Sequence, residues 1–438
     1  MRAPATPPPG SPAEPDRLRR EVHERLVGMM DFAAADRMGR DQLLQECKDR
    51  AAKLVDTAAP RMPVQDRAAL IEGVLDDMFR LGPLEPLLAD ASITDVLVVA
   101  PDRVFVEREG RLHRAEIRFR DASHLLHVIQ RLVRNAGRRI DERSPMVDAR
   151  LPDGSRVNAI IPPLAVDGPQ LSIRRFPGEP LGLPRLVQLG TLPHQTAALL
   201  RAAVAGRLNI IFSGGAGVGK TTLLNAASAA LGWNERVITI EDAAELRLSG
   251  EHVVRLETRA PNVEGVGAVS PRDLVRNALR MRPDRIIMGE CRGGEAFDMM
   301  QAMNTGHEGS MTTLHANSAR DTLVRLESML AMGGFDVPVR VLREYVASAI
   351  HLVVHLVRLP DGRRVVSEVV EVRGTDGDGL RLSTIHRFAL EASREGDVRG
   401  SFVATGHEPQ FLERMRARGV QLGPETFRAG PLGHGGDA

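Results

Sequence analysis

One stretch decides the fold of this chain: Asn209-Ile210-Ile211-Phe212-Ser213-Gly214-Gly215-Ala216-Gly217-Val218-Gly219-Lys220-Thr221-Thr222. It opens with an apolar run short enough for a buried strand, continues through a glycine-rich turn, and leads into helix-forming residues 223–227. Residues 214–221 match G-x-x-x-x-G-K-[ST] at every fixed position, in the strand–loop–helix context that this motif needs. The stretch therefore predicts a phosphate-binding loop, or P-loop.

The chemistry of such a loop follows from its backbone. Glycines let the chain curl so that successive N–H groups point inward at phosphate oxygens, and the start of the helix adds its positive dipole end. Lys220 can reach the β- and γ-phosphates, and the Thr221 hydroxyl can coordinate Mg²⁺. The predicted nucleotide-binding residues are Gly214, Gly215, Ala216, Gly217, Val218, Gly219, Lys220, Thr221 and Thr222.

Length and composition narrow the class of protein. The 438 residues predict two or three domains, and 58 basic against 57 acidic residues leave a net charge of +1. That balance favours neither a nucleic-acid binder nor an acidic one, and aromatic residues at only 3% argue against stacking platforms for single-stranded nucleic acid. Cys47 and Cys291 are too few for a disulfide framework or a zinc cluster. No stretch approaches the roughly 18 apolar residues of a membrane span, so we expect a soluble, intracellular protein.

The first part of the chain divides by composition. Residues 1–15 are proline-rich and predict a disordered lead-in. Residues 16–80 have apolar positions at helical spacing, which predicts a helical bundle, although an amphipathic partner-binding module is an alternative. Residues 81–176 alternate short strands with one helix, as in a smaller mixed α/β domain, and residues 177–190 predict a linker.

Residues 191–373 alternate strands and helices around the P-loop. This alternation predicts an α/β domain with a mainly parallel sheet covered by helices. The turn Pro360-Asp361-Gly362 predicts a hairpin appended to that sheet. Residues 374–438 are weakly patterned, and their structure is left open.

Polar residues follow three of the predicted strands. They are candidates for catalysis, because hydrolysis needs a base, support for a metal ion and positive charge near the nucleotide. One strand leads into Glu241, Asp242 and Glu245, and another ends in Gly289-Glu290. The second resembles a Walker B strand with glycine where an aspartate usually stands, so Glu290 would contact a metal through water. His315 ends a third strand and could donate to a γ-phosphate. Alternatively, the acidic residues could be solvent-exposed loop carboxylates, and His315 could have a structural role.

Together these segments resemble the secretion ATPase superfamily of type II and type IV systems. The resemblance rests on the P-loop and on three further segments in order: Ile240-Glu241-Asp242-Ala243-Ala244-Glu245, Gly289-Glu290-Cys291-Arg292-Gly293-Gly294-Glu295 and Thr312-Thr313-Leu314-His315-Ala316-Asn317. Three others are similar to the tight-adherence (Flp/Tad) pilus assembly branch: Arg255-Leu256-Glu257-Thr258-Arg259, Arg276-Asn277-Ala278-Leu279-Arg280-Met281-Arg282-Pro283-Asp284 and Gln301-Ala302-Met303-Asn304-Thr305-Gly306-His307.

The resemblance implies a RecA-like ATPase domain preceded by a PAS-like α/β domain, with ATP and Mg²⁺ bound between them in a hexameric ring. It makes Glu245 the base, Glu290 the metal support beside Thr221, and His315 the reader of the γ-phosphate. Four further catalytic candidates would supply positive charge, and Arg259 could act with them: Arg174, Arg175, Arg255 and Arg280. The ring would act on an inner-membrane platform protein from the cytoplasm, as a peripheral motor for pilus assembly.

Three other functions stay open. A type IV secretion ATPase exporting DNA or protein would use the same site. A direct nucleic-acid motor could use the basic run Arg131, Arg134, Arg138 and Arg139, but Asp141 and Glu142 adjoin that run and the net charge is near zero, so we expect no direct nucleic-acid binding. The third alternative is a scaffold that binds nucleotide without hydrolysing it. The acidic residues argue against this function, because binding alone does not need them.

Overall fold

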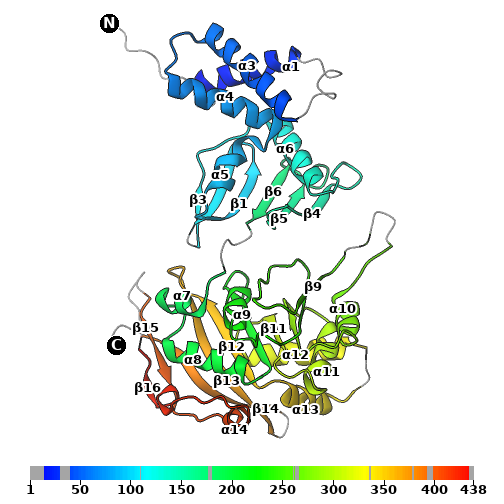
Figure 1. Ribbon diagram of the computed structural model, residues 1–438, viewed down its shortest axis with the longest axis vertical. Helices are drawn as coiled ribbons and strands as arrows, with labels where there is room; N and C mark the ends of the chain where they lie inside the picture. Colours follow the sequence, from blue (N-terminus) through cyan, green and yellow to red (C-terminus); the bar gives the residue numbers. More distant parts are fainter. Residues whose placement is uncertain are drawn as a thin grey trace. The chain divides into compact units, whose positions relative to one another are not determined.

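The computed structural model describes residues 14–29, 40–108, 110–175, 180–259, 261, 266–334, 337–376, 379–391 and 398–433. The chain forms two compact units, Met1–Pro177 and Gly178–Ala438, which are described separately (Figure 1). Most of the proline-rich lead-in, and residues 176–179 around the start of the predicted linker, lie outside the described residues.

In its described residues the first unit begins with the helices α1 (Glu14–Gly28), α3 (Arg40–Ala58) and α4 (Val64–Phe79). Each buries one apolar face, because residues three or four apart lie on the same side of a helix. Val22, Leu26, Val55 and Val74 are at most 1% exposed in the resulting core. Cys47 lies in the same core at 2% exposure, and both cysteines are free thiols.

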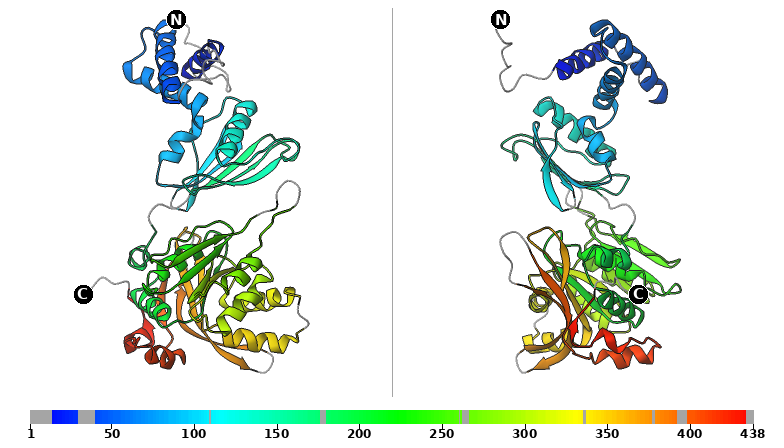
Figure 2. Two further views of the ribbon diagram at one scale, coloured as in Figure 1. Left: turned by 45° about the vertical axis from the view of Figure 1, so that its right-hand side comes forward. Right: turned by 90° about the vertical axis from the view of Figure 1, so that its left-hand side faces the viewer.

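A six-stranded antiparallel sheet completes this unit, in the order β3-β2-β1-β6-β5-β4. Its helix α6 (Ala122–Asn135) is capped by Asp121, whose side chain accepts the His124 N–H at 2.7 Å, and its apolar face packs on the sheet (Figure 2). The remaining elements are η1 (Gly82–Leu84), α5 (Glu85–Ala89), β1 (Ile93–Ala100), β2 (Arg103–Arg108), β3 (Arg111–Arg114), β4 (Met146–Arg150), β5 (Arg156–Ile160) and β6 (Gln170–Arg174). β4 was not predicted, because its pattern is weak and it exists through its hairpin with β5.

The second unit contains a ten-stranded sheet in the order β16-β15-β14-β13-β12-β7-β11-β10-β8-β9. Six neighbouring strands are parallel, which confirms the predicted mainly parallel α/β domain. They are β7 (Ile210–Gly214), β8 (Val237–Glu241), β9 (Val253–Glu257), β10 (Arg285–Met288), β11 (Met311–His315) and β12 (Leu352–Arg358). The P-loop strand β7 lies between β11 and β12, buried along its whole length.

Helices cover both faces of this sheet (Figure 1). On one face α7 (Leu183–Gln188), α8 (His194–Ala205) and α9 (Lys220–Ser228) pack around Phe212. On the other, α10 (Pro271–Ala278), α11 (Glu295–Asn304), α12 (Ala319–Met332) and α13 (Val339–Ala349) pack around Ile211. Helix α7 lies within residues 177–190, assigned to a linker from the sequence, and it buries Leu183 and Leu186 in the first of these cores.

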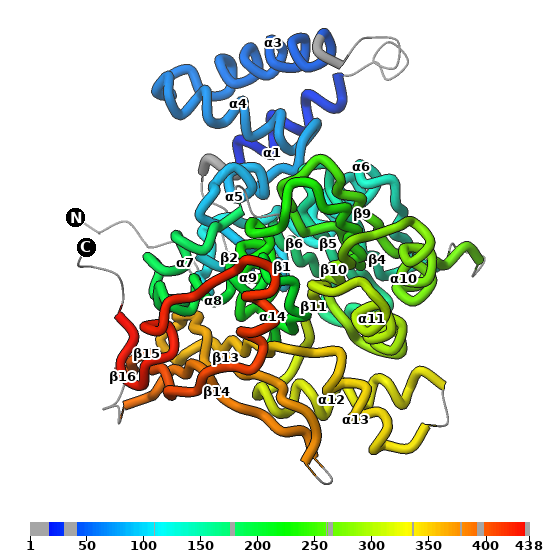
Figure 3. The backbone as a smooth tube through the Cα atoms, turned by 60° about the horizontal axis from the view of Figure 1, so that its bottom comes forward, coloured from blue at the N-terminus to red at the C-terminus, as the bar shows by residue number. Residues whose placement is uncertain are grey.

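The carboxyl-terminal residues, whose structure the sequence left open, extend the sheet. β13 (Arg364–Asp376), β14 (Gly379–Leu390), β15 (Gly400–Ala404) and β16 (Gly430–Pro431) add antiparallel strands beyond β12 (Figure 3). Helix α14 (Phe411–Ala417) and η2 (Pro424–Thr426) follow β15. Phe411, Met415 and Phe427 enter the same apolar core as α8, so residues up to 433 belong to the second unit.

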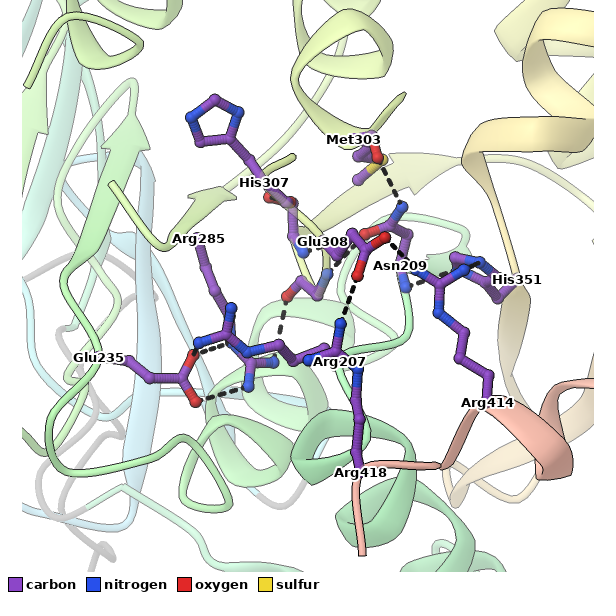
Figure 4. A network of polar contacts seen from close by, with 12 residues as sticks. Arg207, Asn209, Glu235, Arg285, Met303, His307, Glu308, His351, Arg414 and Arg418 are labelled. Atoms are coloured by element: carbon purple, nitrogen blue, oxygen red, sulfur yellow. Dashed lines mark hydrogen bonds and ion pairs between the residues drawn. The ribbon is translucent and has the colours of Figure 1, made fainter. Parts of the chain in front are cut away.

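We call the side where the parallel strands begin the amino edge, and Figure 4 shows its polar network. Arg285 is fully buried, its Nη2 lies 2.8 Å from Glu235 Oε1, and its Nη1 donates to the Val204 carbonyl at 2.7 Å. Arg207 adds a second ion pair to Glu235 at 3.2 Å. A buried charge is tolerated only when it is paired and hydrogen-bonded, and both conditions hold here.

Asn209 and Glu308 complete the amino edge. The Asn209 side chain donates to the Ala349 carbonyl at 2.6 Å and accepts from the Gly309 N–H at 2.7 Å. Glu308 pairs with Arg414 and, at 2.5 Å, with Arg418 near the end of α14. The network thereby ties the carboxyl-terminal helix to the segment that leads into β11.

Among the residues that the structure describes, no helix is both long and apolar enough to cross a membrane.

Candidate nucleotide-binding site

The predicted P-loop connects β7 to α9, and its geometry requires the glycines that predicted it. Gly214 has φ +149°, and a Cβ there would lie only 2.3 Å from the carbonyl oxygen of Leu356 on β12. Gly219 has φ +95° and immediately precedes Lys220, the first residue of α9. Only glycine adopts these conformations at low cost. The loop is therefore a backbone cradle at the start of a helix, where N–H groups can bind phosphate.

Lys220 is folded onto this loop. Its Nζ donates to the carbonyls of Gly215 at 2.7 Å and Gly214 at 3.2 Å, and the residue is 7% exposed. Burial lowers the pKa of Lys220, while the nearby Glu290 carboxylate raises it. The ammonium is therefore bound to carbonyls of the loop itself.

The predicted polar residues form a row across the carboxyl edge, the side where the parallel strands end. We call this the strand-end row: Lys220, His315, Glu290, Arg292 and Asp242. His315 Nδ1 lies 3.4 Å from Lys220 Nζ, and its Nε2 lies 2.9 Å from Glu290 Oε1. Arg292 Nη2 lies 2.8 Å from Glu290 Oε2, and its Nε lies 3.7 Å from Asp242 Oδ2. These residues follow β7, β11, β10 and β8, which are neighbours in that order.

His315 joins the P-loop to the acidic part of the row. Burial lowers its pKa first, and the Lys220 cation lowers it further. The ring is therefore neutral near pH 7, and its two contacts assign the tautomer: Nδ1 accepts from Lys220 and the Nε2–H donates to Glu290. A neutral histidine in this position can exchange its carboxylate partner for a phosphate oxygen.

Glu241 has a different role from its neighbours. It is 4% exposed, and its Oε1 accepts the N–H groups of Glu245 and Leu246, both at 2.9 Å. Burial raises its pKa. A Cβ on Gly289 would lie 2.9 Å from the Glu241 Cγ, so a side chain at position 289 would displace Glu241. Glu241 thus positions the backbone of Glu245, the predicted base.

Sequence reasoning missed three supports of this edge. Glu295, at 9% exposure, accepts the N–H of Arg292 at 2.6 Å and that of Gly293 at 2.8 Å. Arg364 on β13 donates to the Gly217 carbonyl at 2.9 Å. Ser213, the residue before the loop, is 2.9 Å from His355 Nδ1, again between neighbouring strands. The Glu295 contacts are local, at two and three residues along the chain, whereas the Arg364 and Ser213 contacts join distant segments and no local pattern reveals them.

The predicted arginines do not gather at one place. Arg255 donates to the carbonyl of Ala244 at 3.1 Å, beside Glu245, whereas Arg280 is exposed just beyond α10. Arg174 and Arg175 belong to the first unit, where Arg174 pairs with Asp95 at 3.1 Å. Arg175 donates to the Asp90 and Ile93 carbonyls, and Arg259 to the Gly267 carbonyl at 2.6 Å.

One arginine that the sequence did not single out lies beside Arg174. Arg156 on β5 is its cross-strand partner, and Arg150 on β4 is in turn the partner of Arg156. The alternation of the strands puts the three on one face of the six-stranded sheet. The sequence alone could not indicate this cluster of Arg150, Arg156 and Arg174, because it depends on pairing with β4, a strand that was not predicted.

The donor set suits Mg²⁺ brought in with a nucleotide. No group of three or more His, Cys, Asp or Glu side chains able to hold a metal occurs within the described part of the chain. Mg²⁺ commonly uses one or two protein ligands plus phosphates and water. Thr221 is half-buried at the start of α9, and both Glu290 oxygens already have partners in the strand-end row. If Mg²⁺ enters with a nucleotide, Thr221 would be the residue free to bind it directly, and Glu290 would act through water.

A glycine cradle, a buried lysine and a row of polar strand ends define a P-loop nucleotide-binding protein of the α/β class. Comparison with known proteins agrees. The family described as "Type II/IV secretion system protein" matches residues 78–387. A putative conjugal transfer protein of Mycobacterium tuberculosis is 43% identical over 311 residues, which cover 70% of this chain and 88% of that protein. The chain belongs to the type II/IV secretion system protein family.

Two further comparisons place it within that family and fold. The type IV secretion system protein PtlH of Bordetella pertussis is 34% identical over 323 residues, covering 68% of this chain and 95% of that protein. The X-ray structure of the Yersinia pseudotuberculosis ATPase DotB has a TM-score of 0.50 at 17% identity, and the match covers 70% of this chain and 80% of that one. The second comparison supports the fold alone. The tight-adherence branch stays a prediction.

Proposed function

We propose that this protein is an ATPase motor that powers a membrane-bound secretion or assembly machine. The observation that carries the proposal is the strand-end row, which runs from Lys220 through His315 and Glu290 to Arg292 and Asp242. A phosphate binder alone needs only the loop and its lysine. The added carboxylates and the neutral histidine are what hydrolysis and its sensing require.

The residues have distinct roles in this proposal. ATP places its β- and γ-phosphates on the loop N–H groups, and Lys220 exchanges the Gly215 carbonyl for phosphate oxygen. Thr221 would hold Mg²⁺ brought in with ATP, and that ion would offset charge on the phosphates. His315 turns an N–H donor toward the γ-phosphate. Glu245, held by its backbone to Glu241, orients and deprotonates the attacking water.

Loss of the γ-phosphate then changes the partners of His315. The Nε2–H returns to Glu290, which also binds Arg292, and Arg292 reaches Asp242 after β8. The glycine pair Gly293-Gly294 follows at the start of α11. The strand-end row can thus report the state of the nucleotide to the loops after β10 and β8.

Positive charge from outside the row completes the proposed site. Arg255 lies nearest to the candidate base through its bond to the Ala244 carbonyl. Arg174 and Arg175 of the first unit, and Arg280 and Arg259 of the second, would act across the nucleotide or between subunits of a hexamer. The exposed side chain of Arg174 (63%) suits it to such a role better than the backbone-bound Arg175.

The substitution Lys220→Ala tests the enzyme claim. We expect it to abolish phosphate release from ATP, because it removes the charge inside the cradle. The matched control is Lys53→Ala on α3, an exposed helix position that should leave turnover unchanged. Near wild-type, Mg²⁺-dependent turnover by Lys220→Ala would contradict the proposal. Glu245→Gln tests the base separately, by single-turnover hydrolysis with nucleotide binding retained.

Two machines remain candidates for the motor. The names of the relatives, conjugal transfer protein and type IV secretion protein, favour export by a type IV system. The segments around Arg255, Arg276 and Gln301 favour tight-adherence pilus assembly on an inner-membrane platform protein. A pull-down with the cytoplasmic part of a pilus platform protein, against the same assay with a conjugation-channel component, would distinguish them.

A further inference from the structure

A cleft of about 540 Å³ lies beside the P-loop strand, on the face of the sheet opposite α9. Asn317 and Ser318, shortly after β11, line it together with residues of β12, β13 and β14, and we call these strand residues its floor. The residues that matter for its chemistry are His355, Glu368, Arg387 and Leu390. The volume is in the range of real binding sites.

Three residues of the cleft floor, His355, Glu368 and Arg387, lie in one register row with Ser213. Ser213 pairs with His355, His355 with Glu368, and Glu368 with Arg387, so the row crosses β7, β12, β13 and β14. Opposite charges in directly opposed positions have Cβ atoms about 4.5–5.5 Å apart and normally bind each other. Within the described residues, however, neither Glu368 nor Arg387 makes a side-chain hydrogen bond or ion pair. The two charges stand apart and both line the cleft.

A second surface of the same chain carries the complementary pair. On α13, Arg340 and Glu344 are 84% and 52% exposed, and their ion pair measures 3.2 Å. Positions i and i+4 on a helix lie about 5–6 Å apart, which matches the spacing across the strands. Exposed apolar residues flank both sides: Val339 (54%) and Val341 (49%) on α13, and Leu390 (65%) at the cleft.

We propose that the cleft binds α13 of a second copy of this chain, with Arg340 on Glu368 and Glu344 on Arg387. The contact joins two different surfaces, so it is heterologous and can close into a ring. This proposal rests on the proposed function in one respect, since both assume that the protein forms a homo-oligomer. Since His355 joins the cleft floor to Ser213, directly before the P-loop, the neighbouring copy would sense the nucleotide-bearing strand.

Charge reversal tests the contact. Mass photometry of the full chain, with Mg²⁺ and a non-hydrolysable ATP analogue, gives the concentration at which half of the protein is assembled. Arg387→Glu and Glu344→Arg should each raise this concentration at least tenfold. The double variant Arg387→Glu with Glu344→Arg should assemble as the wild type does, because the charges again oppose. The matched control is Arg381→Glu, an exposed arginine on the same strand β14, and it should assemble normally.

A mixture sharpens this test. Neither variant should assemble alone, but an equal mixture should form rings in which the two alternate, because the unchanged α13 meets the unchanged cleft at one contact and the reversed α13 meets the reversed cleft at the next. Three results would overturn the proposal: a monomeric wild type, single variants that assemble normally, or a double variant no better than the singles. The last would mean that something other than α13 occupies the cleft. Loss of hydrolysis with intact, charge-dependent assembly would reject only the proposed motor.

Discussion

The two edges of the parallel sheet differ in how their charges are satisfied. At the amino edge Arg285 is completely buried, and its partners Glu235 and the Val204 carbonyl are built into the fold. At the carboxyl edge Lys220 is nearly as buried, but it binds carbonyls of the loop that phosphate would occupy. One edge is saturated by internal partners, whereas the other holds partners that a ligand can replace.

This difference shows which edge of the sheet is the rigid one. The amino edge joins β7, β10 and β11 to α14 through Asn209, Glu308 and Arg285. A stable base of this kind lets the opposite ends of the same strands carry strained glycines and groups with shifted pKa values. Functional sites commonly concentrate such features on a rigid scaffold.

Arg285→Met should produce the largest effect and should act on stability. It leaves the Glu235 carboxylate at 14% exposure with Arg207, at 3.2 Å, as its one charged partner among the described residues. Breaking a buried ion pair costs about 3–5 kcal/mol. Urea unfolding measures the loss, and Arg381→Met, at 52% exposure, is the control, expected to change stability by about 0.5 kcal/mol or less. A loss below about 1 kcal/mol for Arg285→Met would mean that the amino edge is not the rigid base.

Gly289→Ala should have an intermediate effect at the carboxyl edge. Its Cβ would meet the Glu241 Cγ at 2.9 Å, and overpacking of this kind costs about 1–3 kcal/mol. Displacing Glu241 also releases the N–H of Glu245, so turnover should fall together with stability. Gly28→Ala, where a Cβ meets nothing within 4 Å, is the control.

A double-mutant cycle decides whether the cause is the proposed one. If Glu241 is the group that Gly289→Ala displaces, the alanine should cost almost nothing in a Glu241→Ala background. Additive losses in stability and turnover would point to another contact.

The smallest expected effect is a shift in pH dependence. Burial and Lys220 lower the pKa of His315, whereas Glu290 raises it. Turnover should be level at neutral pH and should fall as the pH drops through this lowered pKa, below about 6.5. Stability has the same sign, because the unfolded histidine binds protons that the folded one does not, so His315 stabilises less as the pH falls.

Glu290→Gln removes the group that raises this pKa. The acid limb of the profile of kcat against pH should therefore move to lower pH. Normalising each profile to its plateau separates this shift from any loss of activity at neutral pH. If the acid limb of the pH profile stayed in place or moved to higher pH, Glu290 would not control the protonation of His315 during turnover.

Much of this architecture was predictable because it is locally encoded. Strand–helix alternation predicted the parallel sheet, and the P-loop motif predicted where β7 ends and α9 begins. Lys220, Glu290 and His315 were predicted as site residues, and the structure brings them into one row. The carboxyl ends of neighbouring parallel strands meet at one edge, so a polar residue after each strand is a readable signal.

Other features had no such signal. The strands β14 to β16 and the packing of α14 depend on pairing between distant segments, such as Glu371 of β13, which is 2% exposed and accepts the Gln410 N–H at 2.7 Å. Glu241 looked like one more acid at the end of a strand. Its structural role became visible only through its contacts with Leu246 and its closeness to Gly289.

The order of residues along the chain was thus enough to determine a phosphate cradle, a parallel α/β sheet and the chemical types gathered around them, since each rests on near neighbours in sequence. Tertiary structure decided which carboxylate binds backbone and which meets His315, and it set Glu368 opposite Arg387 without pairing them. The reason is register: whether two side chains meet depends on how distant strands align, and local patterns carry no information about that alignment.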